Sequence, residues 1–196
     1  MNLDYAFHHC ECVIRMLRGD ENALGDMDIS ADGFWRSFTA IAFSLPAFLF
    51  YWVSFARDQI AGGVQSSMGA MIGAQALIDL FLWLLPLVVL AFVLPPLGLG
   101  RNYTGLVIAR NWLGAIFMYV LAGLAAIDMF VPATGDDLVA LLYLIVLIVT
   151  IWMVFRVTNM ALDRRIGVTS ALVAVEFVVT YALAAWLGTV LGLFAS

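Results

Sequence analysis

Five long apolar runs, separated by short polar connections, fill most of the chain. They cover residues 37–56, 70–94, 105–131, 138–155 and 168–195. A helix rises about 1.5 Å per residue and the hydrocarbon core of a bilayer is about 30 Å thick, so each run is long enough to span it. A single run in lipid satisfies its own backbone hydrogen bonds only as a helix. The sequence therefore predicts an all-α polytopic membrane protein with five transmembrane helices.

The segment 1–33 has an amphipathic pattern instead. The apolar residues that recur there at helical spacing are Leu3, Phe7, Cys10, Ile14 and Leu17. We expect a helix of about five turns lying in the cytoplasmic interface, with packing against the ends of the spans as the alternative. Gly19 is the expected stop, an acidic linker follows, and Ser30 or Asp32 is the expected cap of the first spanning helix. The transmembrane domain is then 34–196.

Composition agrees with this pattern. Hydrophobic residues make up 64% of the chain and charged residues 12%, whereas a soluble domain carries about 25% charged residues. The net charge of −5 argues against a nucleic-acid partner, and the bilayer is the expected one. All nine basic residues are arginine. That bias is typical of GC-rich coding and favours a bacterial source.

The arginines are distributed unevenly around the five runs, which predicts an orientation. Only Arg57 belongs to the side of the first and third loops. The other side holds Arg15, Arg18, Arg36, Arg101, Arg110, Arg156, Arg164 and Arg165. Because cytoplasmic loops carry the excess of basic residues, we expect the N-terminus in the cytoplasm and the C-terminus in the periplasm of a bacterial inner membrane.

Ionisable groups inside the spans are costly in lipid and mark candidate sites. Asp79 lies well inside the second run, with Gln75 one turn before it and Pro86 two turns after it. Pro86 cannot donate to the carbonyl of Leu82, so we expect a kink there. Asp79, Gln75 and the freed carbonyl could line a polar cavity. Alternatively, Asp79 hydrogen-bonds to a neighbouring helix and only fixes its packing.

Arg110 in the third run and Glu176 in the fifth lie at compatible depths, counted from the same side. We therefore predict an ion pair between them, which would fix the register of the two helices. Asn111 is adjacent and could join this pair. Arg110 could instead extend its side chain to the interface.

The last run also carries a stripe at four-residue spacing: Glu176, Thr180, Ala184, Gly188 and Gly192. Gly188 and Gly192 form a GxxxG pattern, which allows two helices to approach closely. Packing within the chain and contact in a homo-oligomer are both compatible with it. Ala184, Gly188 and Gly192 are thus candidate helix-packing residues.

His8, His9, Cys10 and Cys12 suggest a metal, but they supply no second separated pair of ligands, as zinc sites usually have. We interpret them as part of an interfacial helix, with free thiols and no bound metal. Catalytic patterns such as HExxH or GxSxG do not occur in the sequence. No enzymatic activity and no cofactor are predicted.

Two short stretches resemble a known family. They are Asp-Gly-Phe-Trp-Arg-Ser-Phe at 32–38, leading into a run that contains Pro46, and Tyr103 followed by Ile-Ala-Arg-Asn-Trp at 108–112. With the five closely spaced spans, they resemble bacterial relatives of the Yip-domain family of Rab-interacting membrane proteins. The resemblance implies membrane organisation or trafficking rather than catalysis.

The sequence favours a non-enzymatic membrane protein that organises lipid or partner proteins through helix packing, with a homo-oligomer as one possible assembly. The alternative is a small transporter or channel subunit that uses Asp79 and the Pro86 kink. The two hypotheses differ in the surroundings of Asp79, because transport requires a cavity at this residue and an organiser requires a contact with protein.

Overall fold

The computed structural model describes residues 3–130 and 136–193. Its helices are α1 (Leu3–Arg18), α2 (Ala31–Ser37), α3 (Thr39–Ala61), α4 (Met68–Val93), α5 (Tyr103–Phe130), α6 (Asp136–Ala161) and α7 (Ile166–Val190), with short 3-10 turns at Pro95–Leu97 and Gly100–Asn102. Within the described residues there is no strand, and five helical segments are long and apolar enough to cross a membrane. The first of these segments joins α2 to α3. The predicted all-α fold class with five spanning helices is confirmed.

The helix boundaries differ from the predicted ones by up to about six residues, at both ends of the bundle. The first spanning segment begins at Ala31, and α6 continues to Ala161 where the apolar run ends at residue 155. Arg156 interrupts hydropathy but not helicity, because arginine is a good helix former. Its guanidinium donates a hydrogen bond to the Leu17 carbonyl at the end of α1.

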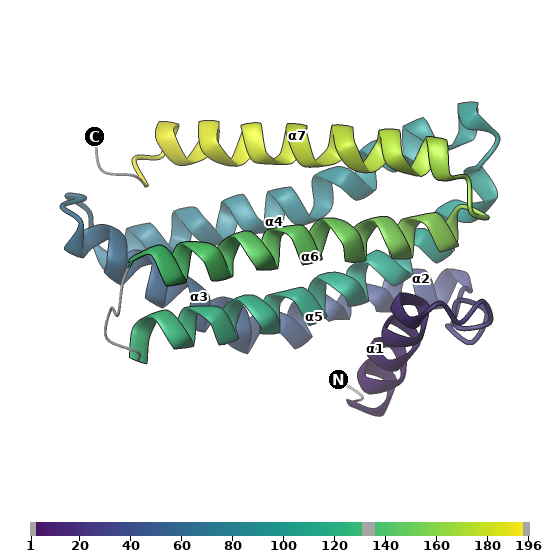
Figure 1. The fold of residues 1–196 in the computed structure, drawn as a ribbon, viewed down its shortest axis with the longest axis horizontal. Coiled ribbons are helices and arrows are strands. Elements are labelled where there is room, and N and C mark those ends of the chain that lie inside the picture. Colours follow the sequence, from purple (N-terminus) through teal and green to yellow (C-terminus); the bar gives the residue numbers. More distant parts are fainter. Residues whose placement is uncertain (1–2, 131–135, 194–196) are drawn as a thin grey trace.

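The five long segments run side by side (Figure 1), and α5 packs against more of the other helices than any other segment does. α5 packs against α1, α2, α3 and α6, whereas α7 packs on α4 and α6 at the far side of the bundle. The extensive packing of α5 is visible in its fully buried side chains: Leu106, Val107, Ile108, Ala109, Trp112 and Ala115. By contrast, α6 and α7 are the least buried of the five spanning segments.

Helix α1 crosses one end of the bundle and docks on α5 and α6 (Figure 1). Its buried residues are Ala6, His9, Cys12, Val13 and Met16. Leu3, Phe7 and Ile14, which the sequence assigns to the apolar face, stay exposed. The Phe7 ring lies 6.1 Å from the ring of Phe43 in α3, on the side of the spanning helices. α1 thus packs on the bundle and also keeps an apolar edge beside it.

The predicted helix stop at Gly19 and the predicted helix cap at Ser30 are both confirmed. Gly19 follows the last helical residue with φ +97°, in the left-handed region that glycine adopts without strain. Ser30 caps α2, because its hydroxyl accepts a hydrogen bond from the Gly33 amide at 3.0 Å.

The structure corrects the helix-packing role of Gly192. Helix α7 ends at Val190, and Gly192 has φ +65°. The Gly192 amide donates to the Thr189 carbonyl at 3.1 Å, and the Leu193 amide donates to the Gly188 carbonyl at 2.8 Å. This is a Schellman cap, in which glycine provides the left-handed residue. Gly188 and Gly192 therefore do not share a helix face, although Gly188 itself is buried.

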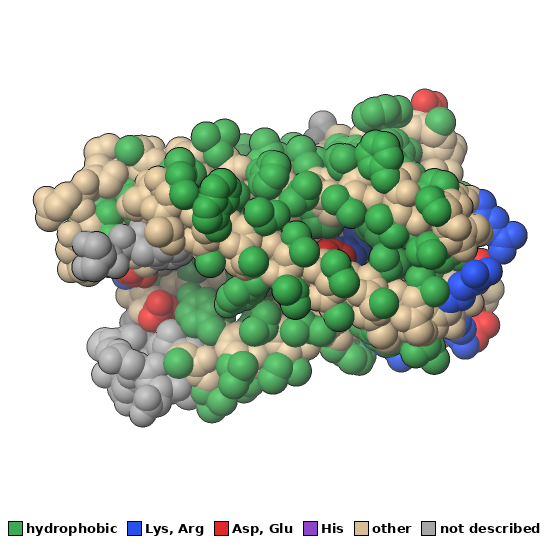
Figure 2. Space-filling model, turned by 90° about the horizontal axis from the view of Figure 1, so that it is seen from above, with side chains coloured by type: hydrophobic (Ala, Val, Ile, Leu, Met, Phe, Trp, Pro, Cys, Tyr) green, Lys and Arg blue, Asp and Glu red, His purple; other side chains and the backbone are tan. Residues whose placement is uncertain are grey.

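The charged side chains gather at the ends of the bundle, and one end carries most of the visible arginines (Figure 2). Ion pairs at that end join Arg15 to Asp20 and Asp26, Arg101 to Asp163, and Arg164 to Glu21. Arg57 pairs with Asp58 near the C-terminal end of α3. Between the two ends, the face that Figure 2 shows carries mainly hydrophobic side chains.

Candidate functional site

The Asp79 side chain of α4 is hydrogen-bonded to the neighbouring helix α3. The indole nitrogen of Trp52 in α3 donates to its carboxylate at 2.7 Å, and the Gln75 side chain donates to the other oxygen at 3.0 Å. Neither of the two cavities described below is lined by Asp79 or Gln75. Of the two alternatives for Asp79, hydrogen bonding to a neighbouring helix is the one that the structure shows.

Pro86, two turns after Asp79 on α4, lies at a cavity although Asp79 does not. α4 remains one helix through Pro86, which lines both cavities. Proline has no N–H, so the Leu82 carbonyl lacks its usual helical donor. The alternative in which Asp79, Gln75 and the freed Leu82 carbonyl line a polar cavity is thus not the one found, because Leu82 and Pro86 lie at a cavity and Asp79 and Gln75 do not.

Arg110 and Glu176 form the predicted ion pair, which joins α5 to α7. Glu176 accepts from Arg110 with both carboxylate oxygens, one of them from Nη1 at 3.1 Å. Arg110 Nη1 also donates to the Thr158 hydroxyl of α6 at 3.2 Å. Their side chains are 11% and 16% exposed, respectively. The alternative in which Arg110 reaches the interface is not the one found.

Asn111 does not join this pair. Its carbonyl accepts from the indole nitrogen of Trp83 at 2.9 Å, and its amide donates to the Ser37 hydroxyl at 2.8 Å. Successive residues on a helix point about 100° apart, so Arg110 and Asn111 face different neighbours. Asn111 instead connects the first spanning segment, α4 and α5.

The sequence interpretation missed the roles of Trp52 and Trp83. Each donates its indole N–H to a polar side chain of another helix, Asp79 and Asn111 respectively. A buried tryptophan usually requires such an acceptor, and few acceptors are present inside these spans. That requirement is the signal that could have paired them.

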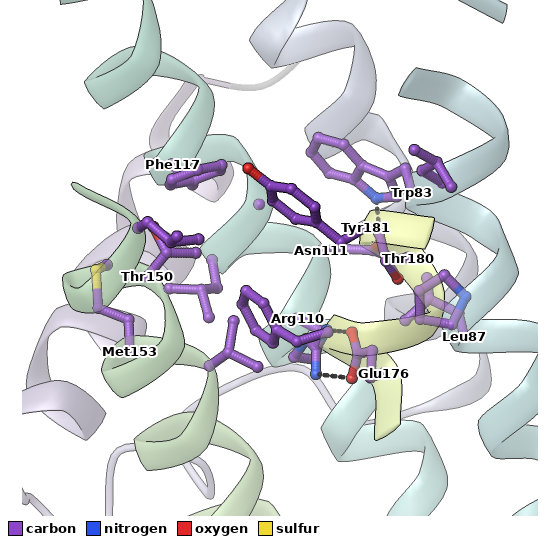
Figure 3. Close-up of a pocket in the computed structure, with 17 residues that line it drawn as sticks. Trp83, Leu87, Arg110, Asn111, Phe117, Thr150, Met153, Glu176, Thr180 and Tyr181 are labelled. Carbon is purple, nitrogen blue, oxygen red and sulfur yellow. Dashed lines mark hydrogen bonds and ion pairs between the residues drawn. The ribbon is translucent and has the colours of Figure 1, made fainter. Parts of the chain in front are cut away.

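A cavity of about 340 Å³ lies between α4, α5, α6 and α7, with the ion pair in its wall (Figure 3). This volume is within the range of small-molecule sites. Its polar lining residues are Arg110, Asn111, Thr150, Glu176, Thr180 and Tyr181; its apolar ones include Leu82, Leu87, Leu113, Phe117, Leu147, Met153, Val154 and Phe177. Gly114 also lines it, and a Cβ there would lie 2.8 Å from the Trp83 ring.

A second cavity, of about 330 Å³, lies between α4 and α7. Its wall is apolar except for Glu176 and Thr180, which it shares with the first cavity together with Pro86. Figure 2 shows an acidic and a basic side chain at the bottom of a hollow in the middle of an apolar face.

His9 and Cys12 lie on the buried face of α1, whereas His8 is exposed and donates to the Asp26 carbonyl. His9 Nδ1 donates to the Tyr5 carbonyl at 2.8 Å, and the Asp28 amide donates to His9 Nε2 at 3.4 Å. Burial lowers the pKa of His9, and it raises the pKa of Cys10 to about 11. A protonated thiol is a poor metal ligand. In the described part of the chain, no three His, Cys, Asp or Glu side chains are grouped to hold a metal ion.

Comparison of the chain with family models, curated proteins and solved structures found no match. The class that the fold defines is a helical integral membrane protein with five candidate spanning helices among its described residues. The resemblance to the Yip-domain family stays a prediction.

Proposed function

We propose that this chain is a non-enzymatic protein of a bacterial inner membrane that organises lipid through a rigid arrangement of helices. The observation that carries the proposal is the contact of Asp79 with Trp52 and Gln75. An acidic residue used for ion or proton transport needs water or a cavity on its path. Here the two neighbouring side chains occupy both carboxylate oxygens.

The proposal includes a cytoplasmic N-terminus and a periplasmic C-terminus. Arg15, Arg101 and Arg164 lie at the end of the bundle that holds α1 and the α6–α7 connection. This clustering of arginines supports a cytoplasmic location for that end. The exposed apolar edge of α1, formed by Leu3, Phe7 and Ile14, fits contact with the headgroup layer on that side.

Two measurements on the full chain test the proposal. In reconstituted vesicles carrying a pH gradient and an internal pH-sensitive dye, an organiser leaves the gradient intact. Dissipation that Asp79→Asn abolishes would favour the transporter alternative. In native membrane discs extracted with a polymer, we expect the lipids around the protein to be enriched about twofold or more in one class relative to the bulk membrane. Equal compositions would contradict an organising role.

A further inference from the structure

The two cavities meet beneath α7. Pro86, Glu176 and Thr180 lie in the walls of both. α7 packs on α4 and α6, and across the first cavity it is joined to α5 by the Arg110–Glu176 pair. The two cavities therefore border each other beneath α7, and we refer to them as the two arms of one site; Glu176 of the ion pair lies at their junction.

The first arm holds the ion pair at one end, and at its other end apolar side chains lie beside the hydroxyl-bearing Thr150 and Tyr181. Arg110 and Glu176 lie toward the arginine-rich end of the bundle, and Phe117 and Leu147 lie further along (Figure 3 labels Arg110, Glu176 and Phe117). Arg110 and Phe117 are seven residues apart on α5, which is about 10 Å along the helix. The hydroxyl of Thr180 lies one turn beyond Glu176.

The end that holds the ion pair can accept an uncharged group. Bonds to Glu176 and Thr158 use three of the five N–H groups of Arg110, while both oxygens of Glu176 are engaged. The junction therefore offers donors to an oxygen acceptor. Its own charges cancel, so a charged head would enter a low-dielectric site without a counter-ion or would have to break the pair.

The second arm suits a hydrocarbon chain. It is lined by leucines and valines of α4 and α7, and Val89, Val175 and Val179 on its wall are exposed on the outside of the bundle. In a bilayer such a surface faces lipid tails. A chain can therefore enter this arm from the membrane without crossing a polar barrier.

We propose that the site beneath α7 binds an uncharged amphiphile, whose oxygen-bearing head (alcohol, ester or ketone) meets Arg110 and Thr180 and whose hydrocarbon tail lies between α4 and α7. A neutral glycerolipid and a prenyl alcohol or prenyl quinone share this chemistry. The proposal goes beyond the organising role proposed above, which rests on Asp79. Dissipation of the pH gradient that depends on Asp79 would contradict the organising role. It would not contradict binding of an amphiphile beneath α7.

The test uses the full chain in lipid discs and three photoreactive probes with the same diazirine-bearing tail. Their heads are a primary alcohol, a carboxylate and a quaternary ammonium. We expect the alcohol to label α4 and α7 within 85–93 and 171–180 and to do so at least about tenfold more than the charged probes. Competition with unlabelled diacylglycerol, prenyl alcohol or prenyl quinone then distinguishes the sources.

Thr180→Phe fills the junction of the two arms and leaves Arg110 and Glu176 unchanged. Thr189→Phe is the matched control, because Thr189 lies on the same helix, is exposed, and lines neither cavity. We expect Thr180→Phe to lower labelling at least about tenfold and Thr189→Phe to leave it unchanged. If Thr180→Phe does not fold, the preference among the three probe head groups in the unchanged protein still tests the proposal.

Several results would overturn the proposal. Equal labelling of the exposed face of α6 around Leu144 and Ile148 would mean contact with bulk lipid only. Preference for the carboxylate or the ammonium probe would exclude an uncharged head. Full labelling in a folded Thr180→Phe protein would place the amphiphile elsewhere.

Discussion

The indole N–H of Trp52 donates to the Asp79 carboxylate at 2.7 Å and joins α3 to α4 inside the predicted membrane span. With Gln75 as the second donor, the carboxylate has a partner on each oxygen. Such a contact stabilises the packing of two helices because the cost of leaving each donor unpaired in an apolar surrounding exceeds the gain from the bond itself.

Asp79→Asn and Asp79→Leu are expected to differ. Asparagine still accepts a hydrogen bond, so we expect it to lower the free energy of unfolding by about 1 kcal/mol or less, whereas leucine leaves Trp52 and Gln75 unpaired and costs about 1–3 kcal/mol. Denaturant titration in detergent measures both. In a Trp52→Phe background the penalty of leucine should shrink, and an unchanged penalty would show that this hydrogen bond is not its cause.

The orientation of the chain can be tested with fusions on either side of α7. A periplasm-active reporter should be active after Ser196 and inactive after Arg165, because α7 spans the interval between them. A cytoplasm-active reporter at the same positions is the control and should give the reverse result. If both reporters give the opposite result, the arginine-rich end of the bundle lies in the periplasm and the predicted orientation is wrong.

Substitutions at Gly192 test whether this residue ends α7 or packs it against another helix. Gly192→Ala should lower the unfolding free energy by about 1 kcal/mol, since alanine is strained at positive φ, and Gly192→Asn should cost less. Oligomeric state, measured by light scattering in detergent, should not change for either. A change of oligomeric state without loss of stability would restore the GxxxG interpretation.

The number of spanning helices and the pairing of two distant charged residues could be predicted from the lengths of the apolar runs and from the depth of each residue within its run. Five apolar runs correspond to the five spanning segments, and the compatible depths of Arg110 and Glu176 predict their pairing. Ser30 was recognisable because capping depends on local sequence. These features follow from length, charge or neighbouring residues, none of which requires knowledge of how the helices pack.

Features that depend on packing were not predictable in the same way. The cavity exists because of where α7 lies relative to α5, and no local pattern encodes that distance. Gly192 has the same spacing to Gly188 whether it packs a helix or ends one. Periodicity marks a broad stripe on α1, but His9 and Met16 rather than Leu3 and Phe7 are buried.

His9 should make docking of α1 dependent on pH. The hydrogen bond that Nε2 accepts from the Asp28 amide requires the neutral ring, and burial lowers the pKa of His9 below the ordinary value of about 6.5. When α1 undocks, the ring regains that value and binds a proton more readily. The undocked state therefore takes up more protons below about pH 6.5, and docking should weaken as pH falls.

Hydrogen exchange of the α1 amides, corrected for the intrinsic rate, measures this effect between about pH 7.5 and 5.5. Protection should fall on acidification. His9→Gln should remove the pH dependence, whereas His8→Gln, the matched control at an exposed neighbour, should retain it. His8, Asp28 and Arg36 also act on the His9 ring, so His8→Gln should shift the midpoint but keep the dependence, and a dependence that survives His9→Gln would assign the titration to another group.

The Arg110–Glu176 pair should be strongly coupled because it is largely buried. Removing one partner leaves a charge in a low-dielectric site, so Arg110→Met or Glu176→Met alone should cost about 3–5 kcal/mol of unfolding free energy. The double variant should recover much of that loss. The exposed pair Arg101–Asp163 is the control, and its removal should cost about 1 kcal/mol or less. Strictly additive losses at Arg110 and Glu176 would show that the two side chains do not stabilise each other.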